Sequence, residues 1–489
     1  MRSEFVPVAH AVLTELASVV GPKNCISDPA GLRTYECDGL TSFRMIPGAV
    51  ILPATTEEVA EAVRIARRAN LPIVPRGSGT GLSGGALPVP GCVVIGLSRM
   101  RSILEIDLEN AWMRVQPGVA NLDISKRLAS AGYYYAPDPS SQSVCSIGGN
   151  VAENSGGAHC LKYGFTVNHV LGARVVLGDG SVVDLGGPVL DTPGYDLIGV
   201  FVGSEGTLGI VTEVVVRILR KPEATRTFFA TFPSTDEAGQ TVSDIIAAGI
   251  VPAAVEMMDR LAIVAIKAAT GLDWPDVGAA LLMDVDGPVA EVEHTAAQAS
   301  AIAAGRGALE IRRPTDEAER LLMWKGRKSA FAAVGRISHN YIVQDGVIPR
   351  SEIANVLREI ARLTSEAGLR VANVFHAGDG NLHPLILYDA NVPGEEQKAE
   401  HLGGEILKLC VRSGGSITGE HGVGADKAPY MAEMFSEADL QAMAELRCAF
   451  DAENRFNPSK VFPTPRLCGD RPGKYVPSSL ELSGEAGRG

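Results

Sequence analysis

Two histidines and a glutamate in the C-terminal half of the chain have the types and spacing that could bind a metal ion. His376 and His383 lie seven residues apart with a glycine turn between them, and Glu420 stands next to His421 in a second glycine-rich run. Two imidazoles and one carboxylate suit a divalent ion with open coordination positions, and zinc, iron and manganese all accept such ligands. These residues predict a metal centre, against the plainer alternative that the histidines are structural.

Glycine is concentrated in three windows, 76–85, 148–157 and 203–209, which hold 12 of the chain's 54 glycines. Such clusters mark backbone that takes unusual angles or approaches a ligand closely. The first window contains a nominal G-x-G-x-x-G, but Pro88 and Pro90 follow it, so a Rossmann helix cannot begin there. Its amides and hydroxyls instead predict an anion-binding loop. Three such windows favour one extended ligand with a pyrophosphate over three unrelated turns.

In their order, the windows resemble the flavin-binding domain of the vanillyl-alcohol-oxidase type, also called the p-cresol methylhydroxylase fold. The runs PRGSGTGLSGG, SIGGNVAENSGG and GSEGTLGI carry this resemblance, which covers roughly 45–222. It implies that the first window wraps the FAD pyrophosphate, that the second lies along the isoalloxazine and ribityl, and that the third closes near the adenine side. The implied FAD contacts are Arg76, Gly77, Ser78, Gly79, Thr80, Gly81, Ser83, Ser140, Ser141, Gly148, Asn150, Gly203 and Ile210. Because the first window offers no His or Cys, we expect non-covalent FAD.

The C-terminal half resembles the matching domain of flavin-linked D-2-hydroxyacid dehydrogenases. The motifs are HAGDGNLH at 376–383 and GSITGEHGVG at 415–424; with CDGL at 37–40 and YAPDPSSQ at 135–142, the chain up to about 463 resembles the D subunits of bacterial glycolate oxidases. The resemblance implies that Arg327 binds the substrate carboxylate, that His421 is the catalytic base and that Asn457 lies in a segment returning to the flavin. It also implies a metal held by His376, His383 and Glu420.

The activity implied by the resemblance is FAD-dependent oxidation of a short 2-hydroxy acid, glycolate or D-lactate, with hydride transfer to flavin N5. The eight cysteines contain no C-x-x-C, so iron–sulfur clusters are not expected in this chain. Electrons are therefore expected to pass to a quinone, or to a second flavin-type subunit and an iron–sulfur subunit of a glycolate oxidase complex. The alternatives are a stand-alone D-lactate dehydrogenase, a non-catalytic FAD relay subunit and a metal-dependent hydrolase.

The size of the substrate is a separate expectation. Relatives that take longer dicarboxylates carry polar or charged groups at positions that align with Phe331, Val343 and Leu385, which are apolar here. A second carboxylate would be left unpaired against them, which is costly. We therefore expect a short substrate.

These residues need an α+β chain to position them: a two-part FAD-binding domain of the p-cresol methylhydroxylase type, followed by an α+β substrate domain with an antiparallel sheet and helices. The predicted domains are a helical segment at 1–44, the FAD-binding domain at 45–222, the substrate and metal domain at 223–463, and a mobile tail at 464–489. In the first half, apolar spacing predicts a helix at 5–20, and Thr55 or Thr56 should cap another. In the second half, it predicts helices at 236–248, 289–304, 351–367, 395–413 and 437–449.

Composition excludes several classes of protein. The 489 residues carry a net charge of -13, which argues against a nucleic-acid binder and against direct binding to anionic lipid. No apolar run reaches the roughly 18–20 residues of a membrane span, and the N-terminus lacks the pattern of a signal peptide. We expect a cytoplasmic protein, with peripheral attachment to the inner face of a membrane through its complex left open.

Overall fold

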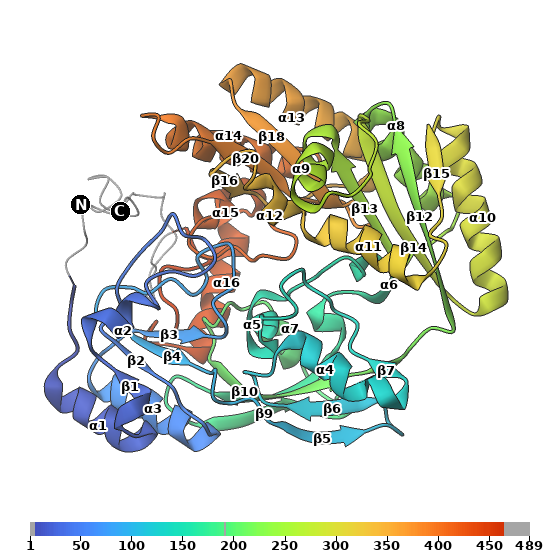
Figure 1. The fold of residues 1–489 in the computed structure, drawn as a ribbon. Helices are drawn as coiled ribbons and strands as arrows, with labels where there is room; N and C mark the ends of the chain where they lie inside the picture. The colour runs from blue at the N-terminus through green and yellow to red at the C-terminus, as the bar shows by residue number, and fades with distance from the viewer. Residues whose placement is uncertain (1–4, 190–191, 464–489) are drawn as a thin grey trace. The chain divides into compact units, whose positions relative to one another are not determined.

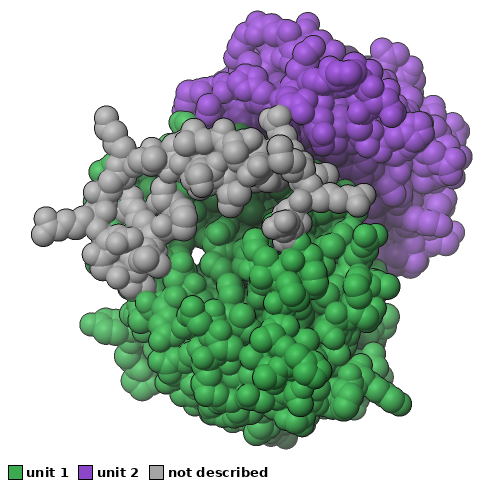
Figure 2. Space-filling model, turned by 90° about the vertical axis from the view of Figure 1, so that its left-hand side faces the viewer, with its two compact units in different colours: residues 1–155, 165–220, 421–489 green, residues 156–164, 221–420 purple. Residues whose placement is uncertain are grey.

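The computed structural model describes residues 5–189 and 192–463. It forms two compact units that alternate along the chain (Figure 2). The first unit comprises the described parts of residues 1–155, 165–220 and 421–489, and the second comprises residues 156–164 and 221–420. The tail predicted at 464–489 lies outside the described residues. Among the described helices, none is both long enough and apolar enough to cross a membrane.

The first unit is built on two principal sheets (Figure 1). One has the strand order β1 (Cys25–Ile26), β2 (Ala49–Ile51), β4 (Val93–Gly96) and β3 (Ile73–Arg76), and β4 runs parallel to both β2 and β3. The other is antiparallel, in the order β5 (Ile103–Asp107), β6 (Trp112–Val115), β10 (Ile210–Arg217), β8 (Val170–Val176) and β9 (Val182–Gly186). A short pair, β7 (Tyr133–Tyr134) and β11 (Leu219–Arg220), stands apart.

Helix α3 (Thr56–Arg68) supplies the crossover that parallel strands require. The Thr55 hydroxyl accepts a hydrogen bond from the Glu58 amide at 3.2 Å, which confirms Thr55 as the predicted cap. The helix predicted at 5–20 is shorter than expected, because it begins at His10. The other helices of this unit are α1 (His10–Val20), α2 (Pro29–Arg33), α4 (Asn121–Leu128), α5 (Ile147–Glu153), α7 (Leu197–Phe201), α15 (Met431–Met434) and α16 (Glu437–Phe450).

The second unit contains a large sheet whose main path runs β15 (Glu310–Arg312), β12 (Ala224–Phe232), β14 (Ala279–Gly287), β13 (Ala254–Asp259), β18 (Arg370–His376), β19 (Asn381–Leu382) and β17 (Gly346–Val347). Strand β20 (Pro384–Tyr388) also pairs with β18, and β16 (Asn340–Val343) pairs with β20. The pairings are antiparallel. An α+β fold class with an antiparallel sheet in the second half is therefore confirmed.

Helices cover both faces of this sheet. Successive side chains of a strand point to opposite faces, so each strand contributes to two hydrophobic cores. Phe228 and Phe232 of β12 pack into one core with helices α8 (Thr235–Ala247), α10 (Val289–Gly305), α13 (Ile353–Ala367) and α14 (Glu395–Arg412). Phe229 packs into the other core with α9 (Arg260–Thr270), α11 (Glu317–Lys328) and α12 (Ala330–Val334). A short helix, α6 (Cys160–Tyr163), also belongs to this unit. Four predicted helices of the second half correspond to α8, α10, α13 and α14, and the fifth to α16; α9 and α11 were not predicted.

Candidate active site and cofactor cradle

The three predicted metal ligands lie together in the second unit. The Nε2 atoms of His376 and His383 are 3.2 Å and 3.1 Å from the same Oε1 atom of Glu420. Two ligand atoms that bind the same ion at about 2.1 Å lie about 3.4 Å apart in tetrahedral geometry, which is close to these two distances. All three side chains are buried, and their ligand atoms lie within 4.8 Å of one another. The donor set and its spacing fit a divalent ion.

Strand register explains why the two histidines meet. His376 is the last residue of β18, and His383 lies between β19 and β20 after the glycine turn. Gly380 in that turn has a φ of +76°, and a Cβ there would lie 2.1 Å from the carbonyl oxygen of Ile348. Glycine is therefore required to reverse the chain at this point. The two imidazole rings end perpendicular to each other, with centroids 5.2 Å apart.

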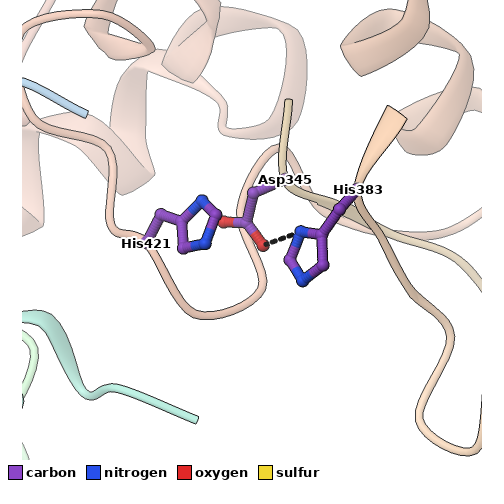
Figure 3. Close-up of side chains that lie close together, drawn as sticks. All are labelled: Asp345, His383 and His421. Carbon is purple, nitrogen blue, oxygen red and sulfur yellow. Dashed lines mark ion pairs between the residues drawn. The ribbon is translucent and has the colours of Figure 1, made fainter. Parts of the chain in front are cut away.

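Asp345 holds the backbone of Glu420, the third predicted ligand. Its fully buried carboxylate accepts hydrogen bonds from the Thr418 hydroxyl at 2.7 Å and from the Gly419 and Glu420 amides at 3.0 Å and 3.2 Å. The same carboxylate lies 3.9 Å from Nδ1 of His383 (Figure 3). Outer carboxylates of this kind orient metal-binding side chains.

Arg327 occupies the last turn of α11 and is buried. Its Nη2 atom is 2.5 Å from Oε2 of Glu256, while its Nε–H has no hydrogen-bond partner among the described residues. Gly326 lets this turn pack closely, because a Cβ there would lie 2.6 Å from Leu272 and 2.8 Å from Trp274. A buried cation with an unused donor is suited to binding an anion.

Two carboxylates of this cluster, Glu256 and Glu420, have lowered pKa values. Burial by itself raises the pKa of Glu256, but the charges of Arg327 and His376 outweigh burial and lower it to about 2. Burial likewise opposes ionisation of Glu420, and hydrogen bonds and charge from His376 and His383 bring its pKa well below the usual range. A lowered pKa favours the carboxylate form of Glu420, which is the form that can bind an ion.

The three apolar residues considered for substrate size are placed close to this cluster. Val343 of β16 and Leu385 of β20 are direct cross-strand partners. The ring of Phe331, on α12, meets the edge of the His383 imidazole with centroids 5.8 Å apart. Phe331, Val343 and Leu385 belong to one hydrophobic cluster of the second unit.

The first and third glycine windows and residues 148–155 of the second are brought together within the first unit. A Cβ at Gly77 would lie 2.5 Å from the Ser146 hydroxyl, so the first window packs against the start of the second. The Gly203 amide donates to the Val151 carbonyl at 2.8 Å, which joins the third window to α5. Side chains at these glycines would fill the space between the loops, so the arrangement fits the cradle of an extended ligand.

Arg76, at the end of β3, lies across the first window. A Cβ at Gly79 would come within 3 Å of its guanidinium atoms, and Gly79 has a φ of +69°. The buried Nη1 atom of Arg76 has no hydrogen-bond partner among the described residues. A cation over a loop of amides fits a pyrophosphate.

Asn457 joins the first and third windows. Its side-chain amide donates to the Gly85 and Glu205 carbonyls, both at 2.7 Å. Its backbone amide donates to the Ile73 carbonyl at 2.8 Å, beside β3. The C-terminal segment therefore returns to the glycine windows.

The remaining predicted cradle residues occupy these loops and their neighbours. Asn150 lies on α5 and accepts from the Asn121 side chain at 3.1 Å. Ile210 is the buried first residue of β10. Loops hold Ser78, Thr80 and Gly81 after β3, and Ser140 and Ser141 before α5, while Gly148 lies on α5.

The segment that begins at His421 belongs to the first unit, where two side chains hold its backbone. The Ser83 hydroxyl donates to the His421 carbonyl at 2.9 Å. The Glu205 carboxylate accepts from the Val423 and Gly424 amides at 2.6 Å and 2.7 Å. The backbone that carries His421 is thereby held by the first and third windows.

Comparison with known proteins identifies the family. Residues 47–186 match the family described as FAD binding domain, and residues 221–461 match FAD linked oxidases, C-terminal domain. The chain is 49% identical over 437 residues to the glycolate oxidase subunit GlcD of Escherichia coli (strain K12), covering 89% of this chain and 88% of that protein. The chain belongs to the GlcD family of FAD-linked oxidases. The predicted resemblance and the FAD-binding character are confirmed.

Two further relatives and one solved structure also match most of the chain. The glycolate oxidase subunit GlcD of Bacillus subtilis (strain 168) is 41% identical, covering 93% of this chain and 97% of that protein. The D-lactate dehydrogenase of Anaerostipes hadrus is 32% identical, covering 90% and 95%. The structure of p-cresol methylhydroxylase with substrate bound matches with a TM-score of 0.77 at 17% identity, covering 94% and 98%, which confirms the predicted fold. The chain is an oxidoreductase, so the hydrolase alternative is set aside.

Three positioning carboxylates were absent from the sequence-based expectations: Glu256, Asp345 and Glu205. Glu256 could have been noticed as the single charge in the apolar run at 253–258. Glu205 stands within the third glycine window, whose glycines predict a role for the backbone alone. Asp345 follows a short strand and carries no pattern of its own.

Proposed function

We propose that the protein oxidises a short 2-hydroxy acid to the 2-oxo acid, using FAD and a divalent ion held by His376, His383 and Glu420. The observation that carries the proposal is the convergence of both Nε2 atoms on one Glu420 oxygen in a chain of the FAD-linked oxidase family. The relatives named glycolate oxidase subunit and D-lactate dehydrogenase support glycolate and D-lactate as substrates. Zinc, iron or manganese would suit the ligands.

Arg327 binds the substrate carboxylate in this proposal. A planar guanidinium matches the geometry of a carboxylate, and the buried Nε–H of Arg327 is available to an incoming carboxylate oxygen. Fixing the carboxylate orients the α-carbon, which lowers the entropic part of the barrier. The ion, when bound, would lower the pKa of the substrate hydroxyl.

His421 takes the hydroxyl proton in this proposal. It follows Glu420 directly, so the two Cα atoms are about 3.8 Å apart, and an imidazole is poised near working pH. Ser83 and Glu205 hold the backbone on which His421 stands. FAD, when bound, would accept the hydride.

FAD would be held by the first unit. The anionic pyrophosphate would lie on Arg76 and the loop from Gly77 to Gly81 with Ser83, where the amides and the cation are grouped. Ser140, Ser141, Gly148 and Asn150 would line the flavin, and Gly203, Ile210 and Asn457 would close the cradle. The glycolate oxidase relatives are named as subunits, so we also propose that an iron–sulfur subunit and a second flavin-type subunit take the electrons.

The FAD is expected to be non-covalent. The first window holds no His or Cys that could bond to the isoalloxazine ring. Acid precipitation of the purified protein should therefore release all of the flavin into the supernatant. Yellow colour that stays with the pellet would show that this expectation is wrong.

Asn457→Asp is expected to loosen the cradle. Both residues tolerate the positive φ of 41° at this position, but a carboxylate cannot donate to the Gly85 and Glu205 carbonyls. Losing two buried hydrogen bonds should lower the free energy of unfolding by about 2–3 kcal/mol and weaken FAD retention. Urea unfolding and flavin content measure both effects, with Asn70→Asp as the control, because Asn70 is exposed and also has a positive φ, of 55°. Unchanged unfolding and flavin retention would contradict the role.

A panel of 2-hydroxy acids tests the function itself. Purified protein of known metal content should reduce an artificial dye with glycolate and D-lactate. If a partner subunit normally takes the electrons, oxygen should be a poorer acceptor than the dye. A protein that reduces the dye with neither acid, although FAD and metal are bound, would refute the proposed function. A strong preference for D-lactate would favour the alternative, a stand-alone D-lactate dehydrogenase.

A further inference from the structure

Glu256 is a single carboxylate at the centre of an apolar strand. It lies on β13 between Val255 and Met257, whose side chains face one hydrophobic core, and it is only 1% exposed. Its own side chain points to the opposite face of the sheet, by the alternation of the strand. A buried carboxylate is costly unless it is paired, so its partners define why it is there.

Its first partner is a proposed metal ligand. Glu256 and His376 are direct cross-strand neighbours, and Oε1 lies 2.6 Å from Nδ1 of His376. The Nε2 atom of the same ring faces Glu420. A carboxylate on Nδ1 fixes the tautomer in which Nδ1 carries the proton and Nε2 presents its lone pair.

Its second partner is the proposed substrate anchor. Oε2, the other oxygen of the same carboxylate, lies 2.5 Å from Nη2 of Arg327. Arg327 is 3% exposed, and its Nε–H is left without a partner among the described residues. Glu256 therefore binds one side of the guanidinium and leaves another donor for an incoming anion.

We propose that Glu256 is a positioning residue that sets both ends of the substrate site: it orients His376 toward the ion with one oxygen and holds Arg327 for the substrate carboxylate with the other. This inference rests on the proposed function, because it gives Glu256 its role through the ion and the substrate carboxylate. One side chain then fixes the distance between the group that binds the substrate hydroxyl and the group that binds its carboxylate. That fixed distance selects acids whose hydroxyl is on the α-carbon.

The test is Glu256→Gln, which keeps the size but removes the charge. An amide can direct its oxygen to only one neighbour and turns an N–H₂ group toward the other. We expect the affinity for added Zn²⁺ or Mn²⁺, titrated into chelator-treated protein, to fall about 10–100-fold. At saturating metal, the KM for glycolate should rise about tenfold or more, with a smaller change in kcat. Glu256→Asp, which keeps the charge on a shorter stem, should recover part of both losses.

Asp259→Asn is the matched control. Asp259 is the last residue of the same strand, and its carboxylate accepts hydrogen bonds from the backbone and side-chain amides of Asn373 on β18, at 2.7 Å and 2.9 Å. It therefore links the same two strands, but it forms no hydrogen bond or ion pair with His376 or Arg327 among the described residues. This variant should keep the wild-type metal affinity and KM. Flavin content reports on the first unit and should be unchanged in every variant.

A second variant covers the case in which Glu256→Gln folds poorly. The double variant Glu256→Gln/Arg327→Gln removes both charges of the buried ion pair, so it should be more stable than Glu256→Gln alone. It should still bind the ion weakly, because His376 has lost its carboxylate partner. Wild-type metal affinity and wild-type KM in folded Glu256→Gln would overturn the inference. If the wild-type protein itself binds no ion, the proposed metal site fails first, and the role of Glu256 toward it fails with that site.

Discussion

Replacing His376 or His383 by alanine is expected to remove the bound ion and to lower the turnover of glycolate by about 10³-fold or more. Each imidazole provides one of the three predicted ligand atoms, which lie within 4.8 Å of one another, so the loss of either would leave an incomplete site. FAD should stay bound, because the glycine windows, apart from Gly156 and Gly157, belong to the first unit and both histidines belong to the second. Metal analysis and flavin content on the same sample measure the two effects separately.

The matched control is His401→Ala, an exposed histidine on α14 of the same unit. It should keep metal, FAD and turnover. Loss of FAD together with metal in His383→Ala would indicate a general folding defect. Full turnover in a variant that has lost its ion would refute a catalytic role for the metal.

Glycolate and D-lactate are expected to be oxidised about 30–150-fold better, in kcat/KM, than D-2-hydroxyglutarate. Val343 and Leu385 face each other across a strand pair, and Phe331 contacts the His383 ring, so the wall near the metal cluster is apolar. A second carboxylate buried there would have no partner and would cost at least about 2–3 kcal/mol. Steady-state dye reduction with each acid measures the ratio.

The control substrate is D-2-hydroxyvalerate, which has the same number of carbons as D-2-hydroxyglutarate but no second carboxylate. If charge is the obstacle, this acid should be oxidised better than the dicarboxylate. Equal rates with glycolate and D-2-hydroxyglutarate would show that Phe331, Val343 and Leu385 do not limit the substrate.

The sequence predicted the long helices of the second half because their apolar positions recur at helical spacing. It did not predict α11, which carries Arg327, because that helix is highly charged and contains Gly326. The glycine pair at 148–149 likewise hid α5, since glycine has low helix propensity. In both places, glycine is explained by close packing against Trp274 and Pro117, which only the tertiary structure shows.

Local motifs predicted the two histidines and the glutamate that the structure brings together, but not the carboxylates that contact them. His376, His383 and Glu420 stand in glycine-rich runs that mark unusual backbone. Glu256 meets His376 through the register of two strands, and Asp345, between β16 and β17, contacts residues 418–420, which are far from it in the sequence. No spacing rule connects residue 256 to residue 376, so cross-strand partners of this kind could not have been predicted from one sequence.

The most direct test of the account is anaerobic mixing of the purified protein with glycolate, followed by the visible absorption of its flavin. We expect rapid bleaching in metal-replete protein, none in protein treated with a chelator, and recovery of bleaching when Zn²⁺, Mn²⁺ or Fe²⁺ is returned. The same sample must retain its FAD throughout, as shown by its flavin content. Bleaching at an equal rate with and without the ion would contradict the metal-assisted oxidation of a 2-hydroxy acid proposed for this chain.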